Sequence, residues 1–240
     1  MHIVHILTRM LRAGSEENIL LTSAGQINAG HRVTLICGEN SRTDLVQELC
    51  PEAEVVEVSC LDRAINPLKD IQALLKLRKT ILELAPDVVH THQSKAGIIG
   101  RFAAAAARVP CVVHGVHILP YIGANKITAT VYLFAERAAA MVTDGYIHVS
   151  QGMMDCCQEN GVGRGIPHTI IHSGFDLSRF SMARPPMDRS ELVDLSDSED
   201  PPIILTMLAS LEPRKRHVEL LTALARLVAD NRRAVSDTHL

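Results

Sequence analysis

The sequence predicts an α/β fold in which a parallel sheet carries helices on both faces. Short runs rich in β-branched residues recur along residues 3–173, and amphipathic or alanine-rich helical patterns separate them. Strands that alternate with helices form βαβ units, whose strands are parallel and whose helices cover the sheet. The composition agrees, because 47% of the residues are hydrophobic and 21% are charged, as in a well-packed globular protein. The expected arrangement is Rossmann-like.

The expected elements alternate along the chain. Apolar, mostly β-branched runs predict strands at residues 3–8, 32–37, 54–58, 87–92, 111–116, 145–150 and 168–173. Helical spacing predicts helices at residues 17–30, 67–85, 94–108, 124–142 and 151–160. Gly30 suits the end of the first helix, and Pro67 suits the first turn of the second. The stretch 9–17 is a polar, glycine-containing turn after the first strand.

The domain organisation follows from a change in composition. Residues 1–180 form the Rossmann-like domain, and residues 181–202, rich in proline and charge, are a linker. Residues 203–210 have the pattern of a buried strand and residues 217–230 that of a helix. One strand and one helix cannot bury their apolar faces alone, so they either pack on the first domain or open a second one. The linker favours residues 203–240 as the start of an incomplete second domain.

Charge and cysteine content limit the classes of function. The formal net charge of -3 argues against nucleic-acid binding, which needs a basic surface. The six cysteines form no CxxC pair, so we expect free thiols, a reducing compartment and a cytoplasmic location. No apolar run reaches transmembrane length, and the first residues resemble a strand rather than a signal peptide. Peripheral association with a membrane stays open.

Histidines stand near the ends of two predicted strands. His90 and His92 would share a face of their strand. His114 and His117 would point to opposite faces unless the strand ends between them, which Gly115 permits. Metal ligation, catalysis and ordinary burial are the three interpretations. Since no cysteine or acidic ligand is placed to complete a metal site, we expect no metal.

Five segments in the right order resemble the GT-B glycosyltransferases of family 4. They are residues 3–36, 87–104, 112–120, 148–180 and 204–224, which correspond to the family's GGxE loop, its DVVHxH segment, its active-site histidine, its VS…NGxD segment and its GRLxxxKG segment. The resemblance implies an N-terminal acceptor-side domain followed by the start of the donor-binding domain. Nothing after residue 202 matches the paired-glutamate E-x7-E motif of the family's donor-binding domain, so we expect a truncated family member.

The activity implied by this resemblance is transfer of a hexosyl group, with retention of configuration, from a nucleotide sugar to a glycan or lipid-linked acceptor. Such enzymes serve cell-envelope polysaccharide or lipopolysaccharide synthesis, and the family needs no cofactor or metal in this domain. The truncated chain by itself would have little or no activity. Two alternatives stay open: a non-catalytic Rossmann-fold binding protein that holds an acceptor or partner subunit, and a nucleotide-sugar epimerase of similar fold.

The resemblance also implies roles for single residues on the donor side. His117 aligns with the active-site histidine beside the donor sugar, although Ile118 replaces the usual glycine after it. Gly14, Ser15 and Glu16 correspond to the GGxE loop that contacts the donor, with serine in place of the second glycine. The alternative for this loop is ordinary capping of the next helix by Ser15.

Further candidates bind phosphate or the acceptor. Lys215 matches the family's phosphate-binding lysine, and Arg214 is a candidate substitute for the arginine that Ser210 replaces. Four residues that start a helix at a strand end are candidates for acceptor contact, with a helix cap at Ser94 as the alternative. These acceptor-side candidates are His92, Ser94, Lys95 and Gly97.

Overall fold

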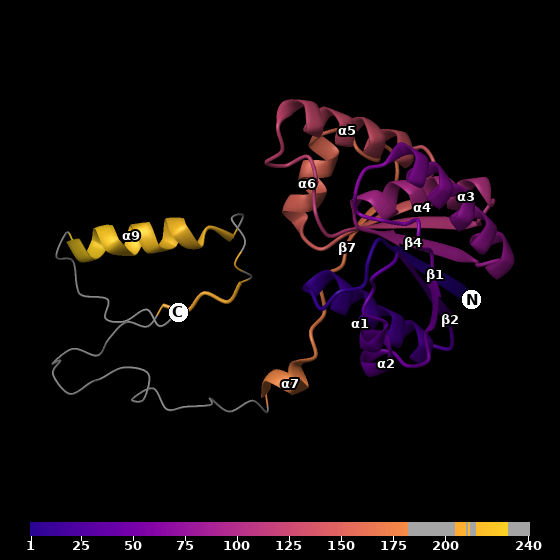
Figure 1. Cartoon of the computed structure of the whole chain (residues 1–240), viewed down its shortest axis with the longest axis horizontal. Helices are drawn as coiled ribbons and strands as arrows, with labels where there is room; N and C mark the ends of the chain where they lie inside the picture. Colours follow the sequence, from indigo (N-terminus) through magenta and orange to yellow (C-terminus); the bar gives the residue numbers. More distant parts are fainter. Residues whose placement is uncertain (182–204, 210, 212–214, 230–240) are drawn as a thin grey trace. The chain divides into compact units, whose positions relative to one another are not determined.

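The computed structural model describes residues 1–181, 205–209, 211 and 215–229. The chain divides into two units, Met1–Phe175 and Asp176–Leu240, and each is described by itself. The first unit contains a seven-stranded, all-parallel sheet with the strand order β3-β2-β1-β4-β5-β6-β7 (Figure 1). The predicted Rossmann-like α/β fold is therefore confirmed.

The elements of the first unit alternate as expected. The strands are β1 (His2–Leu7), β2 (Arg32–Cys37), β3 (Glu54–Glu57), β4 (Val88–His92), β5 (Cys111–Val116), β6 (Gly145–His148) and β7 (His168–Ile170). The helices are α1 (Gly14–Asn28), α2 (Thr43–Leu49), α3 (Pro67–Leu84), α4 (Ser94–Ala106), α5 (Lys126–Ala140) and α6 (Gln151–Glu159). Every predicted strand and helix up to residue 173 forms, although β7 is shorter than expected. The short helix α2 is an element that the sequence pattern does not predict.

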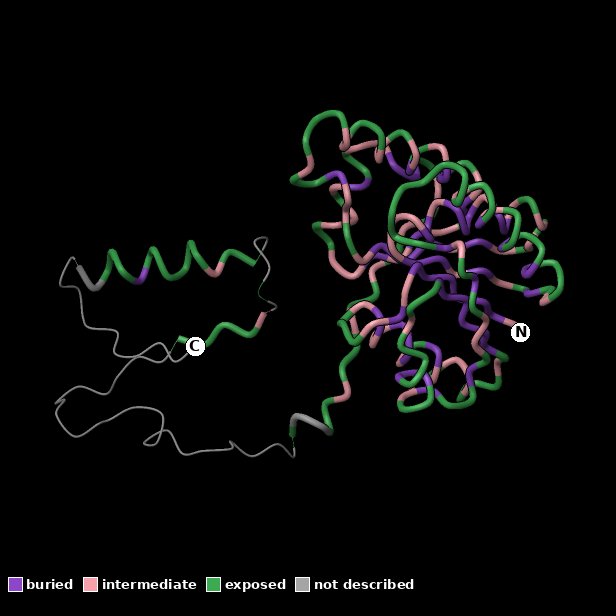
Figure 2. Tube along the Cα trace, viewed as in Figure 1, coloured by how far each residue is buried: buried purple, intermediate pink, exposed green. Residues whose placement is uncertain are grey.

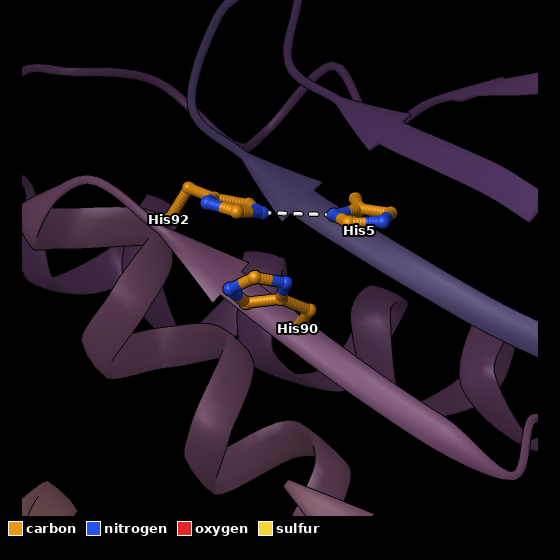
Figure 3. Close-up of side chains that lie close together, drawn as sticks. All are labelled: His5, His90 and His92. Atoms are coloured by element: carbon orange, nitrogen blue, oxygen red, sulfur yellow. Dashed lines mark hydrogen bonds between the residues drawn. The ribbon is translucent and has the colours of Figure 1, made fainter. Parts of the chain in front are cut away.

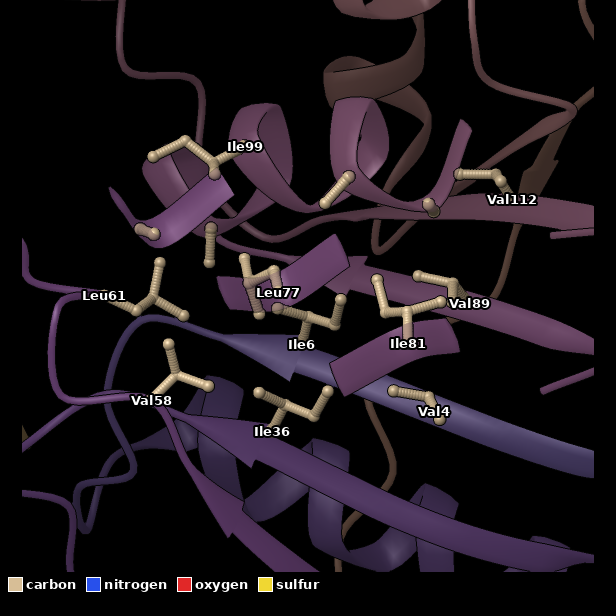
Figure 4. Close-up of a cluster of buried hydrophobic side chains, with 14 residues drawn as sticks. Val4, Ile6, Ile36, Val58, Leu61, Leu77, Ile81, Val89, Ile99 and Val112 are labelled. Carbon is tan, nitrogen blue, oxygen red and sulfur yellow. The ribbon is translucent and has the colours of Figure 1, made fainter. Parts of the chain in front are cut away.

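The sheet has a separate hydrophobic core on each face. On one face, strand residues such as Val4, Ile6 and Val89 pack against α3 and α4 (Figure 4). On the other face, residues such as Leu7 and Leu35 pack against α1 and α2. Successive residues of β1 contribute to opposite cores because side chains alternate along a strand. The buried positions accordingly concentrate along the strands (Figure 2).

The chain reverses its direction of growth at β1. The strands β1, β2 and β3 follow one another toward one edge, and the chain then returns to place β4 on the other side of β1. α1 and α2 lie on one side of the sheet, and α3 to α6 lie on the other (Figure 1). In open parallel sheets, ligands bind outside the carboxyl ends of the strands at such a switch point. A ligand site is therefore expected at the carboxyl ends of β1 and β4.

The second unit contains two described helices, α7 (Leu177–Ser181) and α9 (His217–Ala229). α9 agrees with the helix predicted at residues 217–230. The strand predicted at residues 203–210 is wrong for the part described, because residues 205–209 form no strand. Leu208 in this segment is 99% exposed, so no neighbouring described strand covers its apolar side chain.

The predicted linker at residues 181–202 lies outside the described residues except for Ser181. The first unit ends at Phe175, somewhat before the domain boundary expected at residue 180. Within the described part of the chain, no helix combines the length and the apolar character that crossing a bilayer requires.

Candidate functional site

Four histidines lie on one face of the sheet, near the carboxyl ends of the strands. His5 of β1 stands directly beside His90 of β4 in the parallel register. His92 ends β4, and His117 follows β5. The ring centroids are 5.1 Å apart for His5 and His90, 4.1 Å for His90 and His92, and 5.3 Å for His92 and His117. Figure 3 shows His5, His90 and His92 pointing toward one another from the two neighbouring strands.

A continuous chain of hydrogen bonds joins three of these histidines to helix α1. Nε2 of His5 is 2.8 Å from Oε1 of Gln26, and Nδ1 of His5 is 2.9 Å from Nε2 of His92. Nδ1 of His92 is in turn 3.1 Å from Nε2 of His117. Both ring nitrogens of His5 and of His92 are therefore used inside the chain. Among the described residues, Nδ1 of His117 has no hydrogen-bond partner, so this nitrogen is available to a ligand.

Burial keeps the imidazoles of the cluster neutral. It lowers the pKa of His5 to about 4 and holds the pKa values of His90 and His92 well below the ordinary histidine value. Burial also lowers the pKa of His117, which is only partly covered. The charged form of a histidine is disfavoured where water is excluded. At neutral pH each of these rings therefore carries one proton and offers one lone pair.

Gly115 makes room for the cluster in the middle of β5. A Cβ atom at this position would lie 2.9 Å from Nε2 of His90, 2.9 Å from Nδ1 of His92 and 3.3 Å from Nε2 of His117. The first two distances are shorter than van der Waals contact, so the rings would have to move apart. The glycine is therefore required by the close approach of three histidine rings.

His114 lies on the opposite face from His117, as the alternation along β5 predicts. Its Nδ1 is 2.9 Å from the hydroxyl of Thr91, and its ring meets the ring of Tyr146 edge-on. It packs so closely on α4 that a Cβ at Gly97 would lie 2.5 Å from its Cε1 atom. His114 is therefore a buried core histidine with Nδ1 hydrogen-bonded, in agreement with the interpretation of ordinary burial.

The loop after β1 does not have the structure in which Ser15 caps the next helix. α1 begins at Gly14, its N-cap is Ala13, and no side chain caps it, so the expectation of a Ser15 cap is wrong. Instead, the hydroxyl of Ser15 donates to the carboxylate of Glu16 over 2.5 Å. Gly14 is exposed, and a Cβ there would meet nothing within 4 Å. Packing within the protein therefore does not require this glycine.

Gln93 links the ends of β1 and β4 and is a site residue that the sequence pattern does not reveal. Its Oε1 accepts from the backbone N–H of Thr8, and its Nε2 donates to Glu16, which is buried. The backbone of Gln93 has φ 61° and ψ 177°, a region that is essentially restricted to glycine. This strained residue holds the first turn of α1 against the end of β4, and the two strand ends that border the histidines are thereby fixed.

The four acceptor-side candidates do not lie together. His92 belongs to the histidine cluster. The ammonium of Lys95 is 2.5 Å from the carboxylate of Asp70 and also donates to the carbonyl of Ala64, which ties it to the region of α3. Gly97 faces His114 on the opposite side of the sheet. Ser94 is the first residue of α4, whose N-cap is Gln93, so the expected Ser94 cap is wrong.

The two phosphate-binding candidates belong to the second unit. Lys215 is exposed and lies just before α9. Arg214 lies outside the described residues. Their contribution to a donor site stays a prediction.

Three of the histidines also lie close enough together to be considered as metal ligands. One ring nitrogen from each of His5, His90 and His92 falls within 4.8 Å of the others, and Nε2 of His90 is buried without a hydrogen-bond partner. Two nitrogen ligands of a tetrahedral zinc ion stand about 3.3 Å apart. The facing nitrogens of His5 and His92 are closer, at 2.9 Å. This spacing fits a hydrogen bond between the two rings better than two ligands of one ion.

A cavity of about 310 Å³ lies elsewhere, between α3 and β3. It is lined by Val56, Glu57, Lys76, Lys79, Thr80, Glu83 and Leu84. None of these residues belongs to the histidine cluster or to the loop after β1, and the chemistry of the candidate site does not extend to this cavity.

A curated relative acts on a lipid-linked sugar. The UDP-Gal:alpha-D-GlcNAc-diphosphoundecaprenol alpha-1,3-galactosyltransferase of Escherichia coli is 29% identical to this chain over 231 residues. The match covers 95% of this chain and 58% of the relative, so the chain spans little more than half of that relative's length.

Solved structures share the fold of the chain. The sucrose-phosphate synthase of Thermosynechococcus elongatus has a TM-score of 0.57 and 16% identity over 74% of this chain and 49% of that chain. A glycosyltransferase from Rickettsia africae has a TM-score of 0.56 and 17% identity over 77% and 46%. A UDP-N-acetylglucosamine 2-epimerase from Rickettsia bellii has a TM-score of 0.53 and 13% identity over 75% and 47%. At these identities the structures show a common fold and no more.

The family match covers most of the first unit. It extends over residues 13–174, from the loop after β1 to the residues that follow β7, and it therefore includes the helix start at Gly14 and three of the four clustered histidines. The GT-B resemblance expected from the sequence is confirmed, and the chain belongs to the glycosyl transferase 4-like domain family.

Proposed function

We propose that this chain supplies the acceptor-side domain of a retaining glycosyltransferase that moves a hexosyl group from a nucleotide sugar to a lipid-linked acceptor. The observation that supports this best is the position of His117. It follows β5 at the carboxyl edge of the sheet, is hydrogen-bonded to His92, and keeps Nδ1 unpaired among the described residues. The named activity of the Escherichia coli relative supports the choice of substrates.

His117 acts on the sugar as a neutral imidazole in this proposal. Burial lowers its pKa, so its free nitrogen carries a lone pair at neutral pH. A neutral imidazole can accept a hydrogen bond from a sugar hydroxyl, and it can take a proton that the hydroxyl loses. Either action orients the hydroxyl while positive charge builds up on the sugar being transferred.

The loop after β1 lies against the donor diphosphate. α1 starts at Gly14 without a side-chain cap, so its first backbone N–H groups are available to an anion. The open space beside Gly14 allows a phosphate to approach the backbone. The carboxylate of Glu16 accepts hydrogen bonds from Ser15 and Gln93, and these two contacts stabilise its negative charge. Lys215 and Arg214 are the proposed cationic groups on the donor side, and no metal is required.

The proposed activity belongs to a protein that includes more than these 240 residues. Since the chain matches 58% of the galactosyltransferase's length, we propose that it transfers little or no sugar alone. The proposed setting is cell-envelope polysaccharide synthesis at the cytoplasmic face of a membrane.

An exposed apolar stripe on α5 supports contact with a lipid surface. Ile127, Val131, Phe134 and Met141 recur at helical spacing and are 60–86% exposed. The stripe begins just after the loop that follows His117. Exposed apolar patches of this kind mark sites of protein or membrane contact.

The membrane contact is tested with vesicles of an anionic lipid. The Phe134→Ser variant should cosediment with the vesicles several-fold less than the unaltered chain. Leu75→Ser, which removes an exposed apolar side chain from α3, is the matched control and should bind as before. Equal binding by the Phe134→Ser chain would contradict the contact.

The transferase activity is tested in a chimera. This chain replaces the matching segment of the Escherichia coli galactosyltransferase, and the assay measures transfer of galactose from UDP-galactose to GlcNAc-diphosphoundecaprenol. The chimera should transfer galactose, and the His117→Ala variant should be slower by roughly 10²-fold or more. The His31→Ala variant is the control, because His31 lies in the turn between α1 and β2.

Other outcomes of this assay would support the alternatives. A folded chimera that binds the acceptor without transferring sugar would favour a non-catalytic binding protein. Conversion of the sugar nucleotide without any acceptor would favour an epimerase, in agreement with the shared fold of the Rickettsia bellii protein.

A further inference from the structure

The hydrogen-bonded chain from α1 to His117 has a direction that can be deduced from its chemistry. It contains Gln26, His5, His92 and His117, with three hydrogen bonds of 2.8, 2.9 and 3.1 Å. Each neutral imidazole carries one N–H and one lone pair. Each hydrogen bond between two rings needs one donor and one acceptor. Fixing the proton on one ring therefore fixes the protons on the other two.

The amide of Gln26 sets this direction. Its carbonyl oxygen faces His5 and only accepts, so Nε2 of His5 must donate. Nδ1 of His5 is then an acceptor, and Nε2 of His92 donates to it. By the same reasoning, Nδ1 of His92 accepts from Nε2 of His117. All three rings then carry their proton on Nε2, which is also the tautomer that neutral histidine side chains prefer in water.

We propose that Gln26, acting through His5 and His92, is a positioning residue that holds His117 with its proton on Nε2 and a bare lone pair on Nδ1. This inference rests on the proposed function, because the lone pair on Nδ1 of His117 serves there to accept a hydrogen bond from a substrate hydroxyl. The tautomer itself is a property of the free chain. Its measurement therefore does not depend on any activity.

The position of Gln26 allows this role to be tested by substitution. Gln26 lies on α1 and is only partly buried, so a charged side chain of similar length fits there. A glutamate can only accept at neutral pH, and a lysine can only donate. Gln26→Glu therefore keeps the direction of the chain, whereas Gln26→Lys reverses all three hydrogen bonds. A residue with a merely structural role would give similar results for both variants.

The experiment uses the 240-residue chain labelled with ¹⁵N at histidine. Long-range ¹H–¹⁵N correlations identify which ring nitrogen of His117 carries the proton. We expect the Nε2–H form in the unaltered chain and in Gln26→Glu, and the Nδ1–H form in Gln26→Lys. Gln47→Lys, on the exposed surface of α2, is the control and should leave the tautomer unchanged.

Two outcomes of the tautomer measurement would overturn the proposal. One is the Nδ1–H form of His117 in the unaltered chain, which needs no variant to fold. The other is an unchanged tautomer in a folded Gln26→Lys chain. Addition of Co²⁺ provides a separate check on the cluster. One equivalent bound with a tetrahedral absorption spectrum, lost in His90→Ala, would make His5, His90 and His92 a metal site and also overturn it.

The consequence for catalysis is measured in the chimera. The Gln26→Lys substitution should lower kcat by roughly 10²-fold with little change in KM. The Gln26→Glu variant should keep most of the kcat of the unaltered chimera. If the tautomers agree with the proposal but the unaltered chimera transfers no sugar, the proposed function fails and the hydrogen-bond chain stands. If the chimera is active but His117 carries its proton on Nδ1, the proposed function stands and the proposed role of Gln26 fails.

Discussion

Replacing Gly115 by alanine should disrupt the histidine cluster, because the three heavy atoms nearest the new Cβ all belong to its rings. The new Cβ would lie 2.9 Å from ring nitrogens of both His90 and His92. It would also lie 3.3 Å from Nε2 of His117, beside the 3.1 Å hydrogen bond between His92 and His117. The rings are held by their own strands, so they can relax only by separating. The bond that connects His117 to the chain should therefore be lost.

The size of the effect follows from three contributions. Overpacking of a well-packed interior costs roughly 1–3 kcal/mol. Loss of the hydrogen bond costs about 1 kcal/mol. Alanine restricts the unfolded chain more than glycine does, which recovers roughly 0.4–1 kcal/mol. The expected net destabilisation is thus roughly 1–3.6 kcal/mol, or about 2–14 °C in the midpoint of thermal unfolding for a domain of this size.

Thermal unfolding followed by circular dichroism measures this change, with Gly152→Ala as the matched control. Gly152 lies in the first turn of α6, and a Cβ there would meet nothing within 4 Å. The control should be stabilised by roughly 0.5–1 kcal/mol. The reasoning is refuted if Gly115→Ala unfolds at the same temperature as the unaltered chain and its His117 resonances do not move.

Three further predictions concern buried charge, pH and the donor loop. Arg101→Met should lower the free energy of unfolding in urea by roughly 3–5 kcal/mol, because it leaves Glu136, the partner of Arg101 at 2.6 Å, buried and unpaired. Adding Glu136→Leu should recover most of the lost stability. A loss below about 1 kcal/mol would contradict this prediction. Because burial lowers the pKa of His5 to about 4 in the folded chain, the unfolded chain binds more protons below pH 6.5. The contribution of His5 to stability should therefore be full above pH 6.5 and fall by about 3 kcal/mol on the way to pH 4. A His5→Gln chain should show a shallower fall, and an equal slope would be evidence against a buried neutral His5. Gly14→Ala should raise the unfolding temperature slightly, as for Gly152→Ala, because both are first-turn helical glycines with open space beside them. It should weaken UDP-galactose binding to the chimera about tenfold, because the proposed donor site uses that space; equal affinity would argue against the donor loop.

The fold of the first unit could be predicted because each element carries its own local pattern. The runs in β1, β2 and β5 are β-branched and bounded by polar residues, and Pro67 and Gly30 mark a helix start and a helix end. The short helix α2 could not be predicted, because its seven residues are too few to show helical periodicity. The strand expected at residues 203–210 was predicted from apolar content alone, and residues 205–209 have no described strand beside them with which to pair.

The candidate site could be predicted only in part, because its main contacts join distant segments. The pairing of His90 with His92 on one face follows from strand alternation. The addition of His5 depends on β1 and β4 being neighbours, which no local pattern reveals. Gln26 contributes through a helix face turned toward the sheet, and Gln93 through a backbone conformation that glutamine rarely adopts. The available signal was His5, a histidine inside the apolar run of β1.

Two of the acceptor-side candidates, Lys95 and Gly97, contact other parts of the chain than the histidine cluster for a physical reason. Proximity in sequence placed Ser94, Lys95 and Gly97 at the carboxyl end of β4. A helix turns successive side chains by 100°, so these residues leave in different directions. Lys95 meets Asp70, and Gly97 meets His114. Acceptor binding by this turn of α4 therefore stays a prediction that is best supported at His92.

The central claim is that a lipid-linked acceptor meets this chain at His117. The most direct measurement is a titration of the ¹⁵N-histidine-labelled chain with GlcNAc-diphosphate carrying a short polyprenyl group. The account predicts saturable changes at His117 and His92, no change at the buried His114, and binding weakened about tenfold by His117→Ala. Binding that leaves the His117 and His92 signals unmoved, or that His117→Ala does not weaken, would contradict it.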